Sequence, residues 1–367
     1  MALTGNYVEG KASVSGAGSF LNPRACVSRD ISVAYLAVEL DEESILLDST
    51  AASGIRGIRY VRESGLKNLV SIDMNSDAYA AMEKNFAKNK ITAKTLNQSL
   101  QEYANTAKER FDFIDIDPFG GITPYIYDAM KISKDGTHLM VTATDTAVLC
   151  GASANACIRL YGTKPIHNEL SHEFGLRTMI GYVARTAAQF NEGIKVNLAL
   201  SYMHYMRVFI ELKSGSESAL DSIKTLGHLH YCTACHSWDT DKDFIAKRQR
   251  CSRCGGQMAV YGPAWMGRLN DRKKTKRISD WTAKNIDFKE SVKVAEMIAS
   301  EPDALFYYHI PTMTKHAGIG SVSPAAIVAA LRKIGFEAST THIHKSSVKT
   351  GAGFADVERA IAELRTL

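Results

Sequence analysis

The sequence predicts an α/β fold built on a doubly wound, Rossmann-like sheet of mostly parallel strands. Two observations predict it. Short apolar runs alternate with helix-like segments through the first half of the 367-residue chain, which is the element order of a parallel sheet covered on both faces. Three of these runs end in aspartate, and such sheets bind their ligands beyond the carboxyl ends of the strands.

The elements follow in order from the apolar pattern. Strands are predicted over residues 44–48, 69–73, 111–117 and 138–144, because each is a short apolar run bounded by polar or turn residues. Helices are predicted over residues 55–63, 76–88 and 124–132, with Gly65 and Gly136 as stops. Residues 194–201 and 207–212 are predicted to add two strands that close the sheet as a hairpin.

A polar segment rich in glycine and serine at residues 213–221 predicts a domain boundary. We therefore expect one domain over residues 1–215 and a C-terminal α/β domain over residues 216–367. Within the second domain, a helix is predicted near residues 324–334.

Composition excludes several classes of protein. Hydrophobic residues make up 45% of the chain and charged residues 23%, which rules out overall disorder. The first 18 residues lack the apolar region of a secretory signal, and no apolar run approaches the length of a membrane span. Seven cysteines, four of them in two close pairs, suit a reducing compartment. We expect a cytoplasmic monomer without a membrane segment.

A nucleoside site is predicted where the first strands end. Asp48 is followed by a run of small residues that ends at Gly54 and Gly57, and small residues let a ligand approach the backbone. Asp73 ends the next strand, where a carboxylate can accept both hydrogen bonds of a ribose diol. Adenosine with a sulfonium tail fits better than NAD, because the turn lacks a phosphate cradle. The alternative is that both aspartates only cap the following helices.

A reacting site is predicted at Asp117-Pro118-Phe119-Gly120, directly after a buried strand. The exocyclic amine of a flat base is a poor nucleophile, because its lone pair is delocalised into the ring. Asp117 could accept a hydrogen bond from that amine and take its proton, while Phe119 offers a stacking face and Pro118 fixes the turn. The base would first have to leave its stack. A simple Asp-Pro turn with Phe119 in the core is the alternative.

Five segments resemble the tRNA (guanine-26) dimethyltransferases of archaeal type: SFLNPRACVSRD (19–30), DSTAASGIRGIRYVRESG (48–65), SIDMNSDA (71–78), DIDPFG (115–120) and THIHKSSVKTGA (341–352). The resemblance covers nearly the whole chain. It implies a class I methyltransferase sheet, S-adenosylmethionine as methyl donor, tRNA as partner, and two methylations of the 2-amino group of guanine 26.

The resemblance also implies roles for individual residues. Arg29, Arg56 and Asp73 would contact S-adenosylmethionine, Asp117 would be the catalytic carboxylate, and Phe20 and Phe119 would sandwich the guanine. Where the family has an acidic residue for the adenine end, this chain reads Asn97-Gln98-Ser99-Leu100, so Ser99 and Leu100 are the candidates there. Lys345 and Lys349 would contact RNA.

A structural zinc site is predicted from Cys232-x-x-Cys235 and Cys251-x-x-Cys254, which 15 residues separate. Four thiolates fill a tetrahedral Zn²⁺ coordination sphere and leave no position for catalysis. We therefore expect a zinc ribbon over residues 228–262. A redox pair or unconnected thiols are the alternatives, and the nearby His228 and His230 are expected to be solvated or packed.

Positive charge concentrates around these cysteines. Residues 228–277 hold 11 basic and four acidic residues, a net charge of +7, against +5 for the whole chain. Neutralisation of tRNA phosphates explains this density, notably at Lys247, Arg248, Arg250, Arg253 and the run 268–277; a solvated charged face is the alternative. Two other functions stay open: a non-catalytic zinc-containing RNA-binding protein, and a methyltransferase for another amine.

Overall fold

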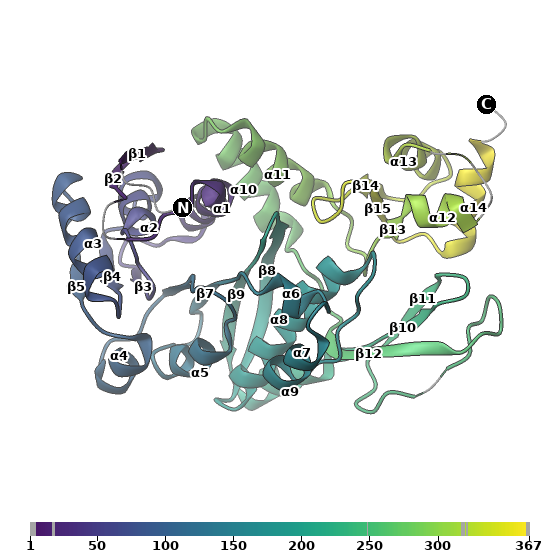
Figure 1. Ribbon diagram of the computed structural model, residues 1–367, viewed down its shortest axis with the longest axis horizontal. Coiled ribbons are helices and arrows are strands. Elements are labelled where there is room, and N and C mark those ends of the chain that lie inside the picture. The colour runs from purple at the N-terminus through teal and green to yellow at the C-terminus, as the bar shows by residue number, and fades with distance from the viewer. Residues whose placement is uncertain (1–4, 17–18, 248, 317–319, 321, 365–367) are drawn as a thin grey trace.

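The computed structural model describes residues 5–16, 19–247, 249–316, 320 and 322–364 (Figure 1). Its centre is a seven-stranded sheet in the order β5-β4-β3-β6-β7-β9-β8. The first five strands of that order run parallel, while β9 pairs antiparallel with both β7 and β8. The strands are β3 (Ile45–Asp48), β4 (Asn68–Ile72), β5 (Lys94–Leu96), β6 (Phe113–Ile116), β7 (His138–Ala143), β8 (Glu192–Tyr202) and β9 (Tyr205–Ser214). The predicted α/β sheet is confirmed.

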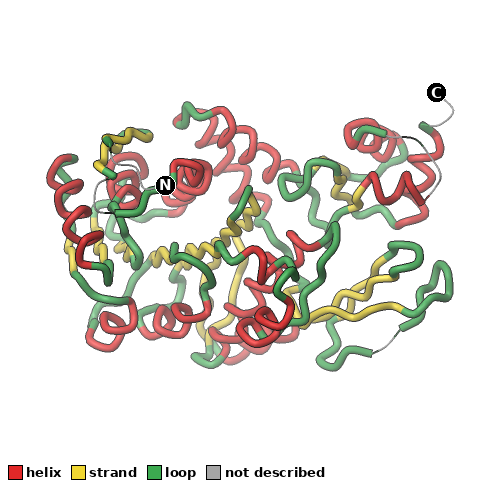
Figure 2. The backbone as a smooth tube through the Cα atoms, in the orientation of Figure 1, coloured by secondary structure: helices red, strands yellow, loops and turns green. Residues whose placement is uncertain are grey.

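Helices cover both faces of this sheet (Figure 2), because side chains alternate along each strand. On β6, for example, Ile114 and Ile116 pack into the core with α4, α5 and α8, whereas Phe113 packs into the core with α1, α2 and α3. The helices of this half are α1 (Cys26–Glu39), α2 (Ile55–Arg59), α3 (Ser76–Lys88), α4 (Leu100–Thr106), α5 (Thr123–Lys131), α6 (Thr146–Leu149), α7 (Ala154–Tyr161), α8 (Ser171–Ala188) and α9 (Ser216–Lys224).

A hairpin of β1 (Asn6–Glu9) and β2 (Ala12–Ser15) precedes α1. It packs on α3, where Asn85 and Asn89 accept hydrogen bonds from the backbone of Ser15 and Ser13. Neither this hairpin nor α1 was predicted from the sequence. The two strands have only four residues each, and α1 is buried without interruption from Val27 to Leu36, so its burial does not follow a one-sided apolar stripe.

The C-terminal half adds two small antiparallel sheets (Figure 1). One has the order β11-β10-β12 and the other β13-β15-β14. Their elements, with the helices around them, are β10 (Leu226–Cys232), β11 (Trp238–Asp241), β12 (Met258–Trp265), α10 (Arg272–Asn285), α11 (Lys289–Ser300), β13 (Tyr308–His309), α12 (Ile310–His316), α13 (Pro324–Lys333), β14 (Ala338–Thr340), β15 (Ser347–Thr350) and α14 (Phe354–Glu363). The helix expected near residues 324–334 is confirmed as α13.

The segment 213–221, where we expect a domain boundary, has regular secondary structure. It forms the end of β9 and most of α9, which packs on α8 and β8. Residues beyond it also enter the cores of the central sheet: Trp265 joins the core on the α8 face, and Ile278 and Val294 join the core on the α1 face. The division at residue 215 stays a prediction, but the two parts share their hydrophobic cores.

Among the described residues, none of the helices combines the length and the apolar character needed to cross a membrane.

Candidate active site at the strand ends

Asp48 ends β3 at the centre of the sheet. It is fully buried, and neither of its carboxylate oxygens has a hydrogen-bond partner among the described residues. Burial and the neighbouring carboxylate of Asp115 raise the pKa of Asp48 well above its ordinary value. A buried, unsatisfied carboxyl group is costly to the fold and marks a place where a ligand can supply the missing partner.

Gly54 lies where the small-residue turn enters α2, with a positive φ of 76°. A Cβ atom there would lie 2.6 Å from the Phe86 ring and 2.9 Å from Met82 Cγ. Close packing of α2 on α3 therefore requires glycine at this position, whether or not a ligand approaches the turn.

Asp73 follows β4 and braces the same turn. Its two carboxylate oxygens accept hydrogen bonds from the backbone N–H of Ala52 at 2.8 Å and of Asn75 at 2.9 Å. Ser99, the candidate for the adenine end, forms a capping box with Glu102 at the start of α4, and the Leu100 side chain lies in the core. The alternative that Asp48 and Asp73 only cap the following helices is wrong, because Asn75 caps α3 and the N-cap of α2 is Gly54 without a side-chain cap.

Asp117 follows β6 and pairs with Arg56 from α2. The Arg56 Nε and Nη2 atoms both contact Asp117 Oδ2, at 2.7 and 2.6 Å. The Asp117 side chain remains 26% exposed, whereas that of Arg56 is 6% exposed. The sequence placed Arg56 and Asp117 in two separate sites, and the structure brings them into direct contact.

A second, fully buried layer lies beneath this pair. Asp115, two residues earlier on β6, accepts hydrogen bonds from the Tyr60 hydroxyl and from Arg207 Nη2, the latter at 2.8 Å. Arg207 also donates to the Thr142 hydroxyl at 2.5 Å. Sequence reasoning did not identify these four residues, although an arginine within the apolar strand β9 was a signal of a buried ion pair.

The cations decide the charge state of Asp117. Burial alone would raise its pKa, but the guanidinium groups of Arg56 and Arg207, together with the Thr142 hydroxyl, outweigh burial and hold the pKa below the ordinary value. Asp117 is therefore an ionised hydrogen-bond acceptor at neutral pH.

Two aromatic rings stand beside Asp117. Phe119 is 70% exposed and Phe20 is 45% exposed, so the core alternative for Phe119 is wrong. Their ring centroids lie 4.4 Å apart in an edge-to-face contact, and Pro118 is buried. A base between two rings needs a centroid separation of about 7 Å, twice a van der Waals contact. The structure thus brings the predicted stacking pair together in a closed arrangement.

Arg29, on α1, forms hydrogen bonds within the protein. Its Nε atom donates to Glu9 Oε1 at 2.6 Å, and its Nη2 atom donates to the backbone oxygen of Asn22 at 3.1 Å. Glu9 pairs in addition with Arg59 at 2.7 Å. This buried cluster ties the β1–β2 hairpin to α1 and α2, next to the loop that carries Phe20.

The four predicted zinc ligands gather in one cluster. The sulfur atoms of Cys232, Cys235, Cys251 and Cys254 all lie within 4.8 Å of one another. Two of the separations, Cys232–Cys254 and Cys235–Cys251, are 3.5 Å, close to the edge of about 3.8 Å that follows from four Zn–S bonds of about 2.3 Å. The donor set and its spacing therefore fit Zn²⁺.

His228 and His230 are buried and hydrogen-bond to Asp241, as the packing alternative expected. Trp238 of β11 packs this module against the C-terminal part of the chain through edge and tilted contacts with Phe306, Tyr308 of β13 and Phe354 of α14.

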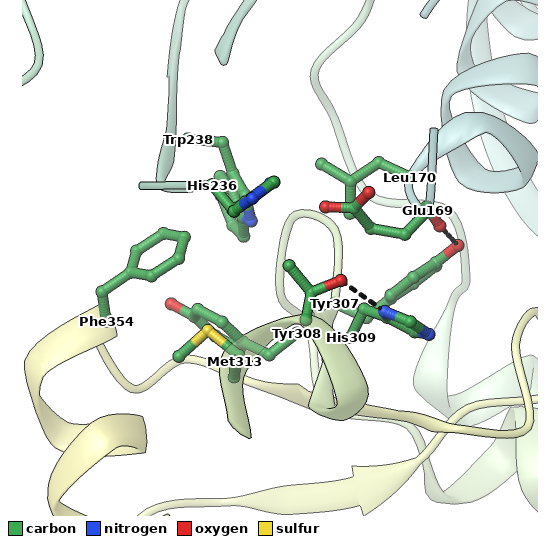
Figure 3. A pocket seen from close by; sticks show the side chains of 10 residues that line it. Glu169, Leu170, His236, Trp238, Tyr307, Tyr308, His309, Met313 and Phe354 are labelled. Atoms are coloured by element: carbon green, nitrogen blue, oxygen red, sulfur yellow. Dashed lines mark hydrogen bonds between the residues drawn. The ribbon is translucent and has the colours of Figure 1, made fainter. Parts of the chain in front are cut away.

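Figure 3 shows the small cavity at this seam, between Trp238, Tyr308, Phe354 and Glu169. Its volume of about 10 Å³ is room for one water molecule at most. The seam joins parts of the protein and is too small to hold a base or a cofactor.

Most cations of the predicted basic run 268–277 already have carboxylate partners. Arg268 pairs with Asp303, Arg272 with Glu337, Lys276 with Asp280, and both Lys274 and Arg277 with Glu39. This part of the positive charge stabilises contacts of α10. Arg248, another of the predicted phosphate contacts, lies outside the described residues.

The expectation that Lys349 contacts RNA is wrong. Its side chain is 3% exposed and its Nζ atom lies 3.2 Å from Glu173 and 3.6 Å from Glu301. Lys345, four residues earlier, is exposed and stays a prediction. The sequence alone does not show which of the two lysines is buried. The strand β15 begins between them, and in this strand the side chain of Lys349 points into the protein.

Carboxylates gathered at the ends of β3, β4 and β6, above a small-residue turn, define a Rossmann-like protein with a ligand site at the carboxyl edge of its sheet. A family model for N2,N2-dimethylguanosine tRNA methyltransferase matches residues 6–362. The chain belongs to this family, and the resemblance seen in the sequence is confirmed.

Individual relatives agree. The tRNA (guanine(26)-N(2))-dimethyltransferase of Methanothermobacter thermautotrophicus is 30% identical over 355 residues, covering 94% of this chain and 93% of that protein. The enzyme of the same name from Thermococcus kodakarensis is 33% identical over 356 residues, covering 92% and 91%. The solved structure of Trm1 from Pyrococcus horikoshii with S-adenosyl-L-methionine has a TM-score of 0.89 at 30% identity, covering 97% of this chain and 99% of that one.

Proposed function

We propose that this chain methylates the 2-amino group of guanine 26 in tRNA, first once and then a second time, with S-adenosyl-L-methionine as the methyl donor. The observation that carries the proposal is Asp117, an ionised carboxylate held at a strand end beside the exposed ring of Phe119, in a chain that belongs to the dimethylguanosine methyltransferase family. Relatives that match along more than nine-tenths of the chain carry this activity in their names.

Asp117 would act on the amine. Both Arg56 contacts fall on Oδ2, so we assign Oδ1 as the oxygen that accepts a hydrogen bond from the guanine amine. That bond draws the nitrogen lone pair out of conjugation and raises its nucleophilicity. After methyl transfer the nitrogen carries a positive charge and is strongly acidic, so even a carboxylate of lowered pKa can take the proton.

The residues at the strand ends fit the cofactor. S-adenosyl-L-methionine supplies a methyl group on a positively charged sulfonium. The unpartnered carboxyl of Asp48 offers a buried acceptor, and the carboxylates of Asp73 and Asp117 give the edge a negative character that favours a cation. Arg29, Asp48, Gly54, Arg56, Asp73, Ser99 and Leu100 are the residues that we propose to hold it.

Phe20 and Phe119 would stack on the two faces of the guanine, and Pro118 would fix the turn that presents Phe119. Because the rings touch at 4.4 Å, they must separate by about 3 Å to admit a base. An extruded base lying in this opening would be shielded from water, as methyl transfer from a sulfonium requires.

The cysteine cluster would hold one structural Zn²⁺, through Cys232, Cys235, Cys251 and Cys254. The sulfur spacing supports this proposal. We propose further that residues 216–367 form the tRNA-binding part, with the zinc ribbon at 228–262, and that the protein acts as a cytoplasmic monomer. All seven cysteines are free thiols in the structure, which supports a reducing compartment.

The test uses unmodified tRNA and a matched transcript in which guanine 26 is replaced by adenine. After incubation with protein and S-adenosyl-L-methionine, mass spectrometry of the nucleosides should show N2-methylguanosine and then N2,N2-dimethylguanosine from the first tRNA only. Asp117→Asn should lose both products while still binding S-adenosylhomocysteine in calorimetry. Full activity of that variant would contradict the role of Asp117, and equal methylation of the adenine-26 transcript would contradict the assigned position.

A further inference from the structure

Phe244 is the most exposed large hydrophobic side chain among the described residues. It is 91% exposed, and its neighbour Ile245 is 75% exposed. Both lie on the loop of residues 242–250, between β11 and the second cysteine pair. Single exposed apolar residues are ordinary, but two in succession with almost no protein contact form a patch that binding would cover.

This ribbon loop, described over residues 242–247 and 249–250, is held at both ends. At its start, Asp241 accepts hydrogen bonds from His230 Nε2 at 2.5 Å and from the backbone N–H of Asp243 at 3.1 Å. At its end, Arg250 forms a β-bridge with Gln257, next to the sulfur cluster. The exposure of Phe244 is therefore a property of a braced loop and not of a frayed terminus.

The charged residues around Phe244 and Ile245 indicate what kind of partner would bind there. Residues 242–247 and 249–253 contain four basic residues and one acidic residue, Asp243. Lys247 pairs with Asp243, and Arg253 pairs with Glu358 of α14. Lys242 and Arg250 are exposed and have no carboxylate partner among the described residues. An apolar protein surface gains nothing from such an excess of positive charge, whereas a nucleic acid offers phosphates for the cations and a base for the ring.

We propose that Phe244 is a stacking platform for an unpaired nucleotide of tRNA, at a second contact separate from the reacting guanine. The inference rests on the proposed function, because it takes tRNA as the partner. Aromatic rings stack on bases of any identity, and neighbouring cations hold the backbone. Ile245 widens the apolar rim without offering a flat face.

The position of the module supports two separate contacts. The sheet β10–β12 lies at the opposite end of the long axis from β5 (Figure 1), whereas the Asp117 and Phe119 site lies at the carboxyl edge of the central sheet. A large, extended polyanion can reach both places at once, which a small amine substrate cannot. Contact at the ribbon loop thus contributes to affinity and leaves the chemistry at Asp117 unchanged.

Four variants of the full-length protein test the proposal by anisotropy titration of fluorescently labelled, unmodified tRNA. Phe244→Ala should weaken tRNA binding about 5- to 150-fold, the range of one base–aromatic stack. Phe244→Trp should restore binding, because it keeps a ring, and Phe244→Leu should not, because it keeps only apolar area. Ile245→Ala, the matched control, should change the dissociation constant less than about twofold.

Two further measurements separate stacking from other causes. The slope of log affinity against log salt should be the same for Phe244→Ala and the wild type, since no phosphate contact is removed. Affinity for S-adenosylhomocysteine and the single-turnover rate at saturating tRNA should also be unchanged, and an unchanged melting temperature shows that the variant is folded.

An unaltered tRNA affinity in Phe244→Ala, or full binding by Phe244→Leu, would overturn the proposal. So would an equal loss in Ile245→Ala. These outcomes differ from failure of the proposed function, in which the wild type itself would leave guanine 26 unmethylated.

Discussion

Three aspartates of one site have three different surroundings. Asp115 is saturated by Tyr60 and Arg207, Asp117 shares Arg56 and keeps some exposure, and Asp48 has no partner among the described residues. Different surroundings give identical side chains different protonation states. At the scale of the residue, the neighbours of each carboxyl group therefore determine its role. Asp115 is structural, Asp117 is an ionised acceptor, and Asp48 can be partnered by a ligand.

The unfavourable burial of the Asp48 carboxyl group should make the stability of the folded protein depend on pH. Its pKa is raised in the folded protein, so the folded state holds a proton that the unfolded state releases above about pH 4. Below about pH 4 the Asp48 carboxyl group is protonated in both states, and the protein keeps its full stability with respect to this group. Above that pH, stability falls as pH rises toward the pKa of Asp48 in the folded protein. Asp48→Asn should therefore melt at an equal or higher temperature than the wild type, by a margin that grows from pH 4 to pH 7. Thermal unfolding at a series of pH values checks this, and a lower melting temperature throughout would contradict it.

Arg56 should set the acid limb of the pH–rate profile. Arg56→Gln removes the main cation that lowers the pKa of Asp117, so more protons are bound to Asp117 at mildly acidic pH and the limb should move to higher pH. Arg56→Lys keeps the charge and should move the limb less, although one ammonium cannot reproduce the paired N–H contacts. Single-turnover methylation across pH measures both variants; identical limbs would remove Arg56 from this role.

At the scale of elements, a buried polar junction joins α8 to the C-terminal sheet. Glu173 of α8 pairs with Arg177 at 2.6 Å and with Lys349 of β15 at 3.2 Å. Glu301, after α11, pairs with His342 at 2.6 Å. Burial would raise the pKa of Glu301, but His342 and Lys349 outweigh it and lower the pKa to about 2. Stability from this carboxylate is present above about pH 4 and is lost as pH falls toward 2.

Lys349→Met should destabilise the protein by about 3–5 kcal/mol, because it leaves two buried carboxylates short of a cation. Lys345→Met is the matched control, since Lys345 is exposed, and it should change stability by less than about 0.5 kcal/mol. Denaturant unfolding of the two variants makes the comparison. Equal effects would show that the burial of Lys349 does not govern its role.

The cysteine module should depend on its metal. Elemental analysis of purified protein should give about one Zn per chain, and Cys235→Ser should reduce this content. Loss of zinc should open the ribbon and free Trp238 from its contacts with Tyr308 and Phe354, which limited proteolysis near residues 232–258 would detect. Protein with no zinc and an intact, protease-resistant ribbon would exclude the four-thiolate site.

At the scale of the whole molecule, the two halves of the chain share two hydrophobic cores. The core on the α8 face includes Leu226 and Trp265, and the core on the α1 face includes Ile278 and Val294. A chain truncated after residue 215 loses these side chains and exposes apolar surface on both faces of the sheet. Residues 1–215 alone should therefore fail to fold cooperatively, whereas the full chain should melt in a single transition. Calorimetry of the fragment and of the full chain makes the comparison; a stable, cooperatively melting fragment would show that the halves are independent.

The sequence by itself determined six of the seven strands of the central sheet, all but β5, and most of its ligand edge. The strands at residues 45–48, 68–72, 113–116 and 138–143 lie where apolar runs predicted them, because local periodicity reports burial directly. The order of the motifs was equally informative, since DPFG and SGIRG are enough to indicate the family. The cysteine spacing likewise predicted a cluster that the folded chain forms.

Only the tertiary structure decided which charges meet. Arg56 and Asp117 are 61 residues apart in the sequence, Arg207 and Asp115 are 92 apart, and Lys349 lies opposite Glu173 across 176 residues. Local propensity carries no information about such partners, because pairing depends on how strands and helices are laid beside one another. The same packing hid Lys349 and left Phe244 exposed, which residue type alone would not have separated.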